Sequence, residues 1–135
     1  MKLFISSLLF VLIAGCSSTK VIDNAIKREP VLYKIVAVAE TEVDKSGDTC
    51  ADAIGIIELL HNKIVGSASD TFGRHYKISG DIDNDKKIAG GFGITIITAV
   101  DFDGEISPDG KKASGKWDDL YKCNGTWTAT KLTKS

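Results

Sequence analysis

From Val31 onward, apolar side chains alternate with other side chains at a period of two, which is the pattern of β-strands. Residues 31–40 show the pattern most clearly, with one fully apolar face and one mixed face. Residues 53–60 predict a second strand, and His61 and Asn62 predict a tight turn after it. Further strands are expected over residues 94–102 and 123–130.

A four-residue motif recurs along this part of the chain: a lysine, two aliphatic or small residues, and a glycine. Its copies occupy residues 63–66, 77–80, 87–90 and 112–115. Three copies directly follow turn-forming residues, so each of these three is expected to open the return strand of a hairpin. The repeat predicts an all-β fold, an antiparallel up-and-down meander of about eight strands that forms a small barrel or a barrel-like sandwich.

Glycines recur on the apolar face of these strands, where they weaken a strand unless they have a structural purpose. They allow a strongly coiled sheet to bend, or allow aromatic rings such as Phe92, Trp117 and Trp127 to lie across the neighbouring backbone. An eight-stranded barrel has an interior that side chains fill or that holds one small ligand. Phe92, Phe102, Trp117 and Trp127 are therefore candidate ligand-lining residues, although a core role is favoured for them.

Composition narrows the classes of function. The 135 residues suit one domain and exclude a multidomain enzyme. Seventeen basic and eighteen acidic residues produce no net field that would attract nucleic acid, so we expect no nucleic-acid partner.

The first sixteen residues resemble a bacterial lipoprotein signal peptide. Met1 and Lys2 precede an apolar run over residues 3–13, which has the length of a signal h-region. The run ends in Ile-Ala-Gly-Cys at residues 13–16, and this tetrapeptide is similar to the lipobox of that family. The resemblance implies cleavage before Cys16, lipidation of Cys16, and an acyl anchor in the membrane.

The leader therefore divides the chain into a signal peptide (1–15), a lipidated N-terminus and tether (16–30), and a β-barrel-like domain (31–135). Ser17 stands where an aspartate would resemble an inner-membrane retention signal. By this resemblance the protein is expected at the bacterial outer membrane, lipid-anchored and facing the periplasm.

Cys50 and Cys123 remain after lipidation, an even number in a chain exported to an oxidising compartment. We expect them to form a disulfide bond. No C-x-x-C spacing or neighbouring histidine indicates a catalytic or metal-binding pair.

The sequence contains only incomplete motifs for metal binding or catalysis. Residues 81–85 begin like a calcium-binding EF-hand loop, but Lys86 and Phe92 stand where that loop needs glycine and glutamate. A hairpin turn is the expected structure there. His61 and His75 have too few companion ligands for zinc, and no nucleophile elbow is present. We expect no metal, no cofactor and no enzymatic activity.

The mature region, with its hairpin repeat and its closing Gly-Lys-Trp and Cys-Asn-Gly-Thr-Trp segments, resembles small secreted or lipid-anchored bacterial β-domains of unassigned function. Three functions are compatible with this likeness. The first is a non-enzymatic envelope domain that binds a protein partner or maintains the envelope. The second is a lipocalin-like barrel for a small apolar ligand. The third is an inhibitor of an envelope-attacking enzyme such as lysozyme, acting through residues 44–48 or 118–121.

Overall fold

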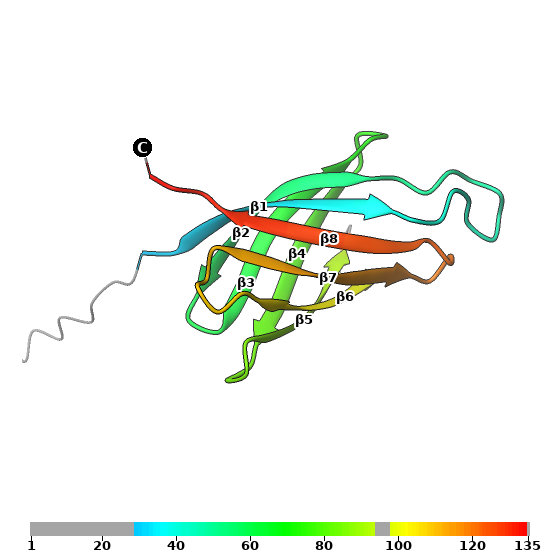
Figure 1. Cartoon of the computed structure of the whole chain (residues 1–135). Helices are drawn as coiled ribbons and strands as arrows, with labels where there is room; N and C mark the ends of the chain where they lie inside the picture. The colour runs from blue at the N-terminus through cyan, green and yellow to red at the C-terminus, as the bar shows by residue number, and fades with distance from the viewer. Residues whose placement is uncertain (1–28, 94–97, 135) are drawn as a thin grey trace, which may run out of the picture.

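The computed structural model describes residues 29–93 and 98–134, which form eight antiparallel strands that close into a barrel (Figure 1). Each strand pairs with the next, and β1 pairs with β8. The prediction of an all-β meander is confirmed, and the open choice between barrel and sandwich is decided for the barrel. The strands are β1 (Val31–Ala39), β2 (Ala53–Leu60), β3 (Lys63–Asp70), β4 (His75–Ile82), β5 (Lys87–Gly93), β6 (Thr98–Ile106), β7 (Lys112–Asp119) and β8 (Asn124–Lys131).

Two expectations fall on residues outside those described. They are the leader with its lipidated Cys16, and residues 94–97 of the strand expected over 94–102. The structure begins β6 at Thr98 and continues it to Ile106, four residues beyond the expected end. Within the described ranges, no helix is long and apolar enough to cross a membrane.

One end of the barrel is closed by short turns and apolar packing. The two-residue turn at His61 and Asn62 joins β2 to β3 as predicted, with His61 at a φ of 57°. The first, third and fourth copies of the lysine motif open β3, β5 and β7 at this end, as expected. Tyr33 donates a hydrogen bond to the carbonyl oxygen of Gly110 at 2.7 Å. Isoleucines pack beside Tyr33 and leave a residual space of only about 10 Å³.

A single five-residue turn recurs at both ends of the barrel. In each copy an aspartate Oδ1 accepts hydrogen bonds from the backbone N–H groups two and four residues later. The backbone N–H of the aspartate also donates to the carbonyl of the fifth residue. The segment that begins like an EF-hand loop is one of these turns, which confirms the expected hairpin. The four aspartates are Asp44, Asp70, Asp83 and Asp119.

Aromatic rings lie over glycines of neighbouring strands, which explains why the apolar face carries glycine. A Cβ on Gly90 would lie 2.5 Å from Cζ of Phe102, and one on Gly104 would lie 2.6 Å from Cζ2 of Trp127. Phe102, which was not among the rings expected to lie across a neighbouring backbone, covers Gly90. Phe92 instead stacks on the Phe102 ring, with 4.9 Å between centroids.

A candidate ligand-binding cavity at the open end of the barrel

The opposite end of the barrel holds a cavity of about 410 Å³. The long β1–β2 loop and the β3–β4 and β7–β8 turns lie at this end, away from the C-terminus (Figure 1). Alanines stand at the inward positions of β1, β2 and β3 that border the cavity, namely Ala37, Ala53 and Ala68. Because these side chains are small, the barrel is filled at its closed end and hollow at its open end.

The four aromatic residues predicted to line a ligand pocket divide into two pairs. Phe92 and Trp117 line the cavity. Phe102 and Trp127 do not border it, so these two have the core role that the sequence favours. They are buried and pack edge to face, with 5.7 Å between centroids. Trp127 also donates a hydrogen bond from Nε1 to the carbonyl oxygen of Asp103 at 2.9 Å.

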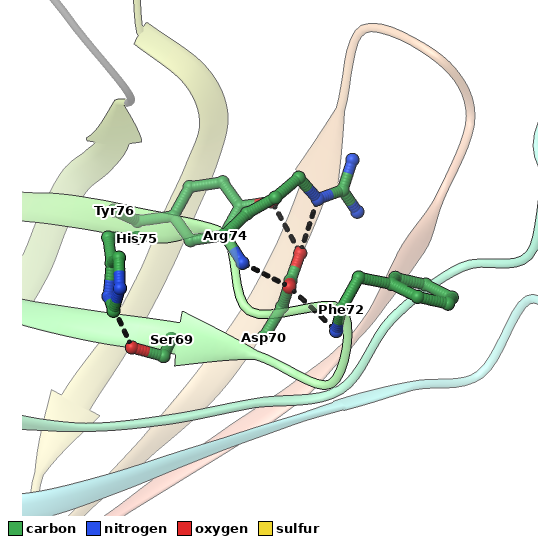
Figure 2. Close-up of polar contacts among 6 residues, drawn as sticks. All are labelled: Ser69, Asp70, Phe72, Arg74, His75 and Tyr76. Atoms are coloured by element: carbon green, nitrogen blue, oxygen red, sulfur yellow. Dashed lines mark hydrogen bonds and ion pairs between the residues drawn. The ribbon is translucent and has the colours of Figure 1, made fainter.

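Asp70 is the centre of a polar cluster on the cavity wall (Figure 2). Its Oδ1 accepts the backbone hydrogen bonds of the recurring turn, from Phe72 and Arg74. Its Oδ2 accepts hydrogen bonds from Nε of Arg74 at 2.6 Å and from the hydroxyl of Tyr76 at 2.8 Å. The Asp70 side chain is only 2% exposed, and all four donors come from the β3–β4 hairpin.

This arrangement shifts the pKa values of all three groups. Burial raises the pKa of Asp70, but the hydrogen bonds from Arg74, Tyr76 and Phe72 outweigh burial and hold it below its ordinary value. Burial and the hydrogen bond to Asp70 raise the pKa of Tyr76 to about 12. The hydrogen bond to Asp70 raises the pKa of Arg74. At neutral pH the cluster is therefore a carboxylate, a guanidinium and a neutral phenol.

Asp119 lies across the open end from this cluster. It is the last residue of β7, and in an eight-stranded barrel β7 stands opposite β3. Asp119 lines the cavity, and its charge contributes to the raised pKa values of Arg74 and Tyr76. The two sides of the opening therefore interact electrostatically through the cavity.

A disulfide bond and a hydrogen bond hold the loops around the opening. Cys50, in the β1–β2 loop, is bonded to Cys123, the residue before β8, as the sequence predicts. The backbone N–H of Lys45 donates to the carbonyl oxygen of Tyr121 at 2.9 Å. The two loops proposed for an enzyme inhibitor, residues 44–48 and 118–121, are thus joined to each other. Exposed apolar side chains stand on the turns of this end, at Phe72, Leu120 and Tyr121.

Trp117 carries a buried donor that the described residues leave unpaired. Its side chain lines the cavity, and the residue is 7% exposed. Its Nε1 has no hydrogen-bond partner in the described part of the chain. The Nε1 lies over Gly125 of β8, where a Cβ would stand 3.0 Å from it. Leaving a buried N–H without an acceptor costs about 1–3 kcal/mol.

Sequence reasoning missed the polar cluster. Asp70 occupies an inward position in the alternation of residues 64, 66 and 68, and a charged residue at such a position was the available signal. Its partners Arg74 and Tyr76 follow it across the β3–β4 turn, at the end of the turn and in β4. Asp119 comes near this cluster only because the barrel closes. His61 and His75, for which the sequence offered too few companion ligands to bind zinc, are both exposed. Nδ1 of His75 lies 2.7 Å from Oγ of Ser69.

Replacing Asp70 with asparagine tests the cluster. We expect Asp70→Asn to lower the free energy of unfolding by about 2 kcal/mol at pH 7, because the amide directs a donor at Arg74 and Tyr76. The lowered pKa of Asp70 means that its contribution is present above the ordinary value of 3.8 and is lost as pH falls through the folded value. Urea unfolding of both proteins between pH 7 and pH 2 should show the difference shrinking on acidification.

Asp83→Asn is the matched control, because it makes the same change in the same turn at an exposed position. It should cost well under half as much. A difference between wild type and Asp70→Asn that stays constant down to pH 2 would contradict the ionic role of Asp70.

Comparison with known proteins adds no family, since no family model matches the chain and no curated protein matches it significantly. Among the described residues, no group of three or more histidine, cysteine, aspartate or glutamate side chains is placed to hold a metal ion. The function is therefore inferred from the cavity itself.

Proposed function

We propose that this domain is a small-ligand-binding barrel that holds one molecule in the cavity at its open end. The observation that carries the proposal is the cavity of about 410 Å³, which lies within the range of small-molecule sites. An interior without such a space would have removed the basis for a ligand-binding function. The contrast with the packed closed end supports the proposal, because the same fold fills its interior where no space is needed.

The chemistry of the wall favours an apolar ligand with a polar group. Alanines and the rings of Phe92 and Trp117 provide apolar surface. A few charged side chains also line the cavity, those of Asp44, Asp48, Asp70, Arg74 and Asp119. An apolar wall with a few convergent polar groups is typical of sites for small molecules.

We further propose that binding takes place at the bacterial outer membrane, on the periplasmic side. The support is the resemblance of residues 13–16 to a lipobox and the serine at position 17. In this proposal the domain is a non-enzymatic binding component of the cell envelope, tethered through Cys16.

Native mass spectrometry tests the binding function. The full chain with Cys16→Ser would be expressed with its own leader and purified from the periplasm. We expect an added mass of a few hundred daltons that dissociates on denaturation, or 1:1 binding of an added apolar probe such as 1-octanol. Ala68→Phe should abolish binding, because it fills the cavity from the inward face of β3.

Ala89→Phe is the control for that substitution, since Ala89 is exposed on the outer face of β5. It should bind like the wild type. Ala53→Phe, nearer the opening, provides a second blocking variant should Ala68→Phe unfold. Absence of both bound mass and probe binding in the folded wild type would refute the proposed function.

Inhibition of an envelope-attacking enzyme is the second candidate. The observation that favours it is the bond between the two loops at the open end, which presents Leu120 and Tyr121 on a surface braced by the disulfide. A lysozyme assay at micromolar protein separates the two functions. Loss of lysozyme activity, reversed by Leu120→Ser in the added protein, would favour inhibition.

A further inference from the structure

The outer surface of the barrel carries its large apolar side chains on one side. Within the described strands, every large hydrophobic side chain that is exposed belongs to β1, β2 or β3, and none belongs to β4 through β8. These three strands are consecutive in the barrel, so the exposed side chains form one face (Figure 1). This apolar face consists of Leu32, Val38, Ile54, Ile56, Leu60 and Val65.

The strand register places a square of four side chains at the middle of the apolar face. Across the β1–β2 pair, Leu32 stands opposite Glu58 and Lys34 stands opposite Ile56. Residues two apart on a strand point to the same side of the sheet, and all four are exposed. Leu32 and Ile56 therefore occupy one diagonal of the square, and Lys34 and Glu58 occupy the other.

The two charged side chains of the square are available to a partner. Neither Lys34 nor Glu58 makes an ion pair with any of the described residues. Elsewhere on the outer surface, by contrast, Lys87 of β5 pairs with Glu105 of β6. The apolar face thus presents one unengaged positive group and one unengaged negative group, surrounded by aliphatic side chains.

The area of the apolar face suits a stable protein interface. Its six residues are 38–50% exposed and provide roughly 500 Å² of surface, near the upper limit of the apolar patch that a monomer leaves uncovered. Lys34, Glu58 and the exposed threonines of the adjoining β8 enlarge this surface to roughly 800 Å², which is the area that each partner buries in a standard interface.

We propose that the apolar face is the interface between two copies of this chain related by a two-fold axis. An axis that follows the Leu32–Ile56 diagonal places Lys34 of each copy beside Glu58 of the other, so two ion pairs form at once. Each charge then enters the interface with a partner, which offsets the cost of removing it from water. The apolar interior of a bilayer offers no cation to Glu58, so a second copy is favoured over a lipid surface.

Sedimentation equilibrium of charge-reversed variants tests this interface. The Cys16→Ser chain purified from the periplasm should dimerise with a Kd on the order of 10 μM or tighter. Lys34→Glu should raise that Kd at least about tenfold, because two like-charge contacts replace the two ion pairs. Glu58→Lys should have the same effect for the same reason.

A mixture of the two variants distinguishes a two-fold interface from any other cause of weakened association. Each variant repels a copy of itself at both contacts, whereas Lys34→Glu facing Glu58→Lys pairs opposite charges at both contacts. The equal mixture should therefore form a heterodimer with a Kd within about threefold of the wild-type value. An interface that does not join these two side chains predicts no such recovery.

Two further variants serve as controls. Lys116→Glu makes the same charge reversal at an exposed position on β7, outside the apolar face, and should keep the wild-type Kd. Ile56→Thr retains a β-branched residue but removes apolar surface at the axis, so it should weaken dimerisation without a change of charge. Both variants should bind 1-octanol like the wild type, because these side chains lie outside the cavity lining.

The outcomes decide between a second copy and other occupants of the apolar face. A wild-type chain that is monomeric at about 100 μM would overturn the interface, as would a mixture of the two charge-reversed variants that fails to associate. A monomer that binds phosphatidylcholine vesicles, and loses that binding in Ile56→Thr, would assign the face to a lipid surface instead. Binding of 1-octanol is measured separately, so failure of the dimer leaves the ligand-binding function standing.

Discussion

Breaking the Cys50–Cys123 disulfide is expected to lower the free energy of unfolding by about 4 kcal/mol. The bond joins residues 73 positions apart, and closing a loop of this length restricts the unfolded chain by about that amount in the chain-entropy model. Such a loss is a large fraction of the stability of a small domain. Urea unfolding of the Cys16→Ser chain, with and without a reductant, measures the difference directly.

The same experiment has a functional consequence. The disulfide holds the β1–β2 loop beside the β7–β8 turn, where Lys45 also bonds to Tyr121. We therefore expect reduction to weaken 1-octanol binding even under conditions in which the barrel stays folded. The double variant Cys50→Ser/Cys123→Ser should match the reduced protein and should not respond to reductant. An unchanged unfolding midpoint on reduction would show that the bond contributes no stability.

Replacing Trp127 with alanine is expected to cost about 4 kcal/mol. Trp127 is 1% exposed, packs against Phe102, and lies over Gly104. Truncation removes a large buried apolar surface and leaves a cavity in a closed barrel that has little freedom to collapse. It also leaves the carbonyl oxygen of Asp103 without the indole donor. Thermal and urea unfolding of the variant measure the loss.

Trp117→Ala is the matched comparison, because the two tryptophans occupy inward positions on neighbouring strands. Trp117 borders the open cavity and makes no indole hydrogen bond within the described chain, so its truncation should cost about half as much. Equal losses of stability in the two variants would contradict the distinction between Trp127 in the packed core and Trp117 at the cavity. Ligand affinity should show the opposite order: Trp117→Ala should weaken binding more than Trp127→Ala, although it costs less stability.

Much of the fold could be predicted because strands and tight turns leave patterns within short stretches of sequence. A period of two places the inward side chains, and turn-forming residues before Lys63, Lys87 and Lys112 mark where strands return. The aspartate turn at Asp83 was recognisable because the hydrogen bonds that stabilise it lie within five residues. Closure could not be predicted in the same way, because the pairing of β1 with β8 joins opposite ends of the domain.

The candidate site was only partly visible in the sequence. The disulfide was predicted from a count of cysteines in a chain that is expected to be exported, and two of the four candidate aromatic residues line the cavity. The other two, Phe102 and Trp127, have the same residue types and the same inward orientation but do not border the cavity. Which inward residues border the cavity depends on the stagger between strands, which no local pattern encodes.

The sequence by itself determined that this is an all-β meander with a disulfide, since alternation, turns and cysteine number act through local chemistry or simple pairing. Only the tertiary structure decided that the sheet closes and that alanines of β1, β2 and β3 leave one end hollow. It also decided that Asp119 faces Asp70 and Arg74 across that hollow. The physical reason is that closure brings β3 and β7, more than forty residues apart in the chain, to opposite walls of one cavity whose low dielectric couples their charges.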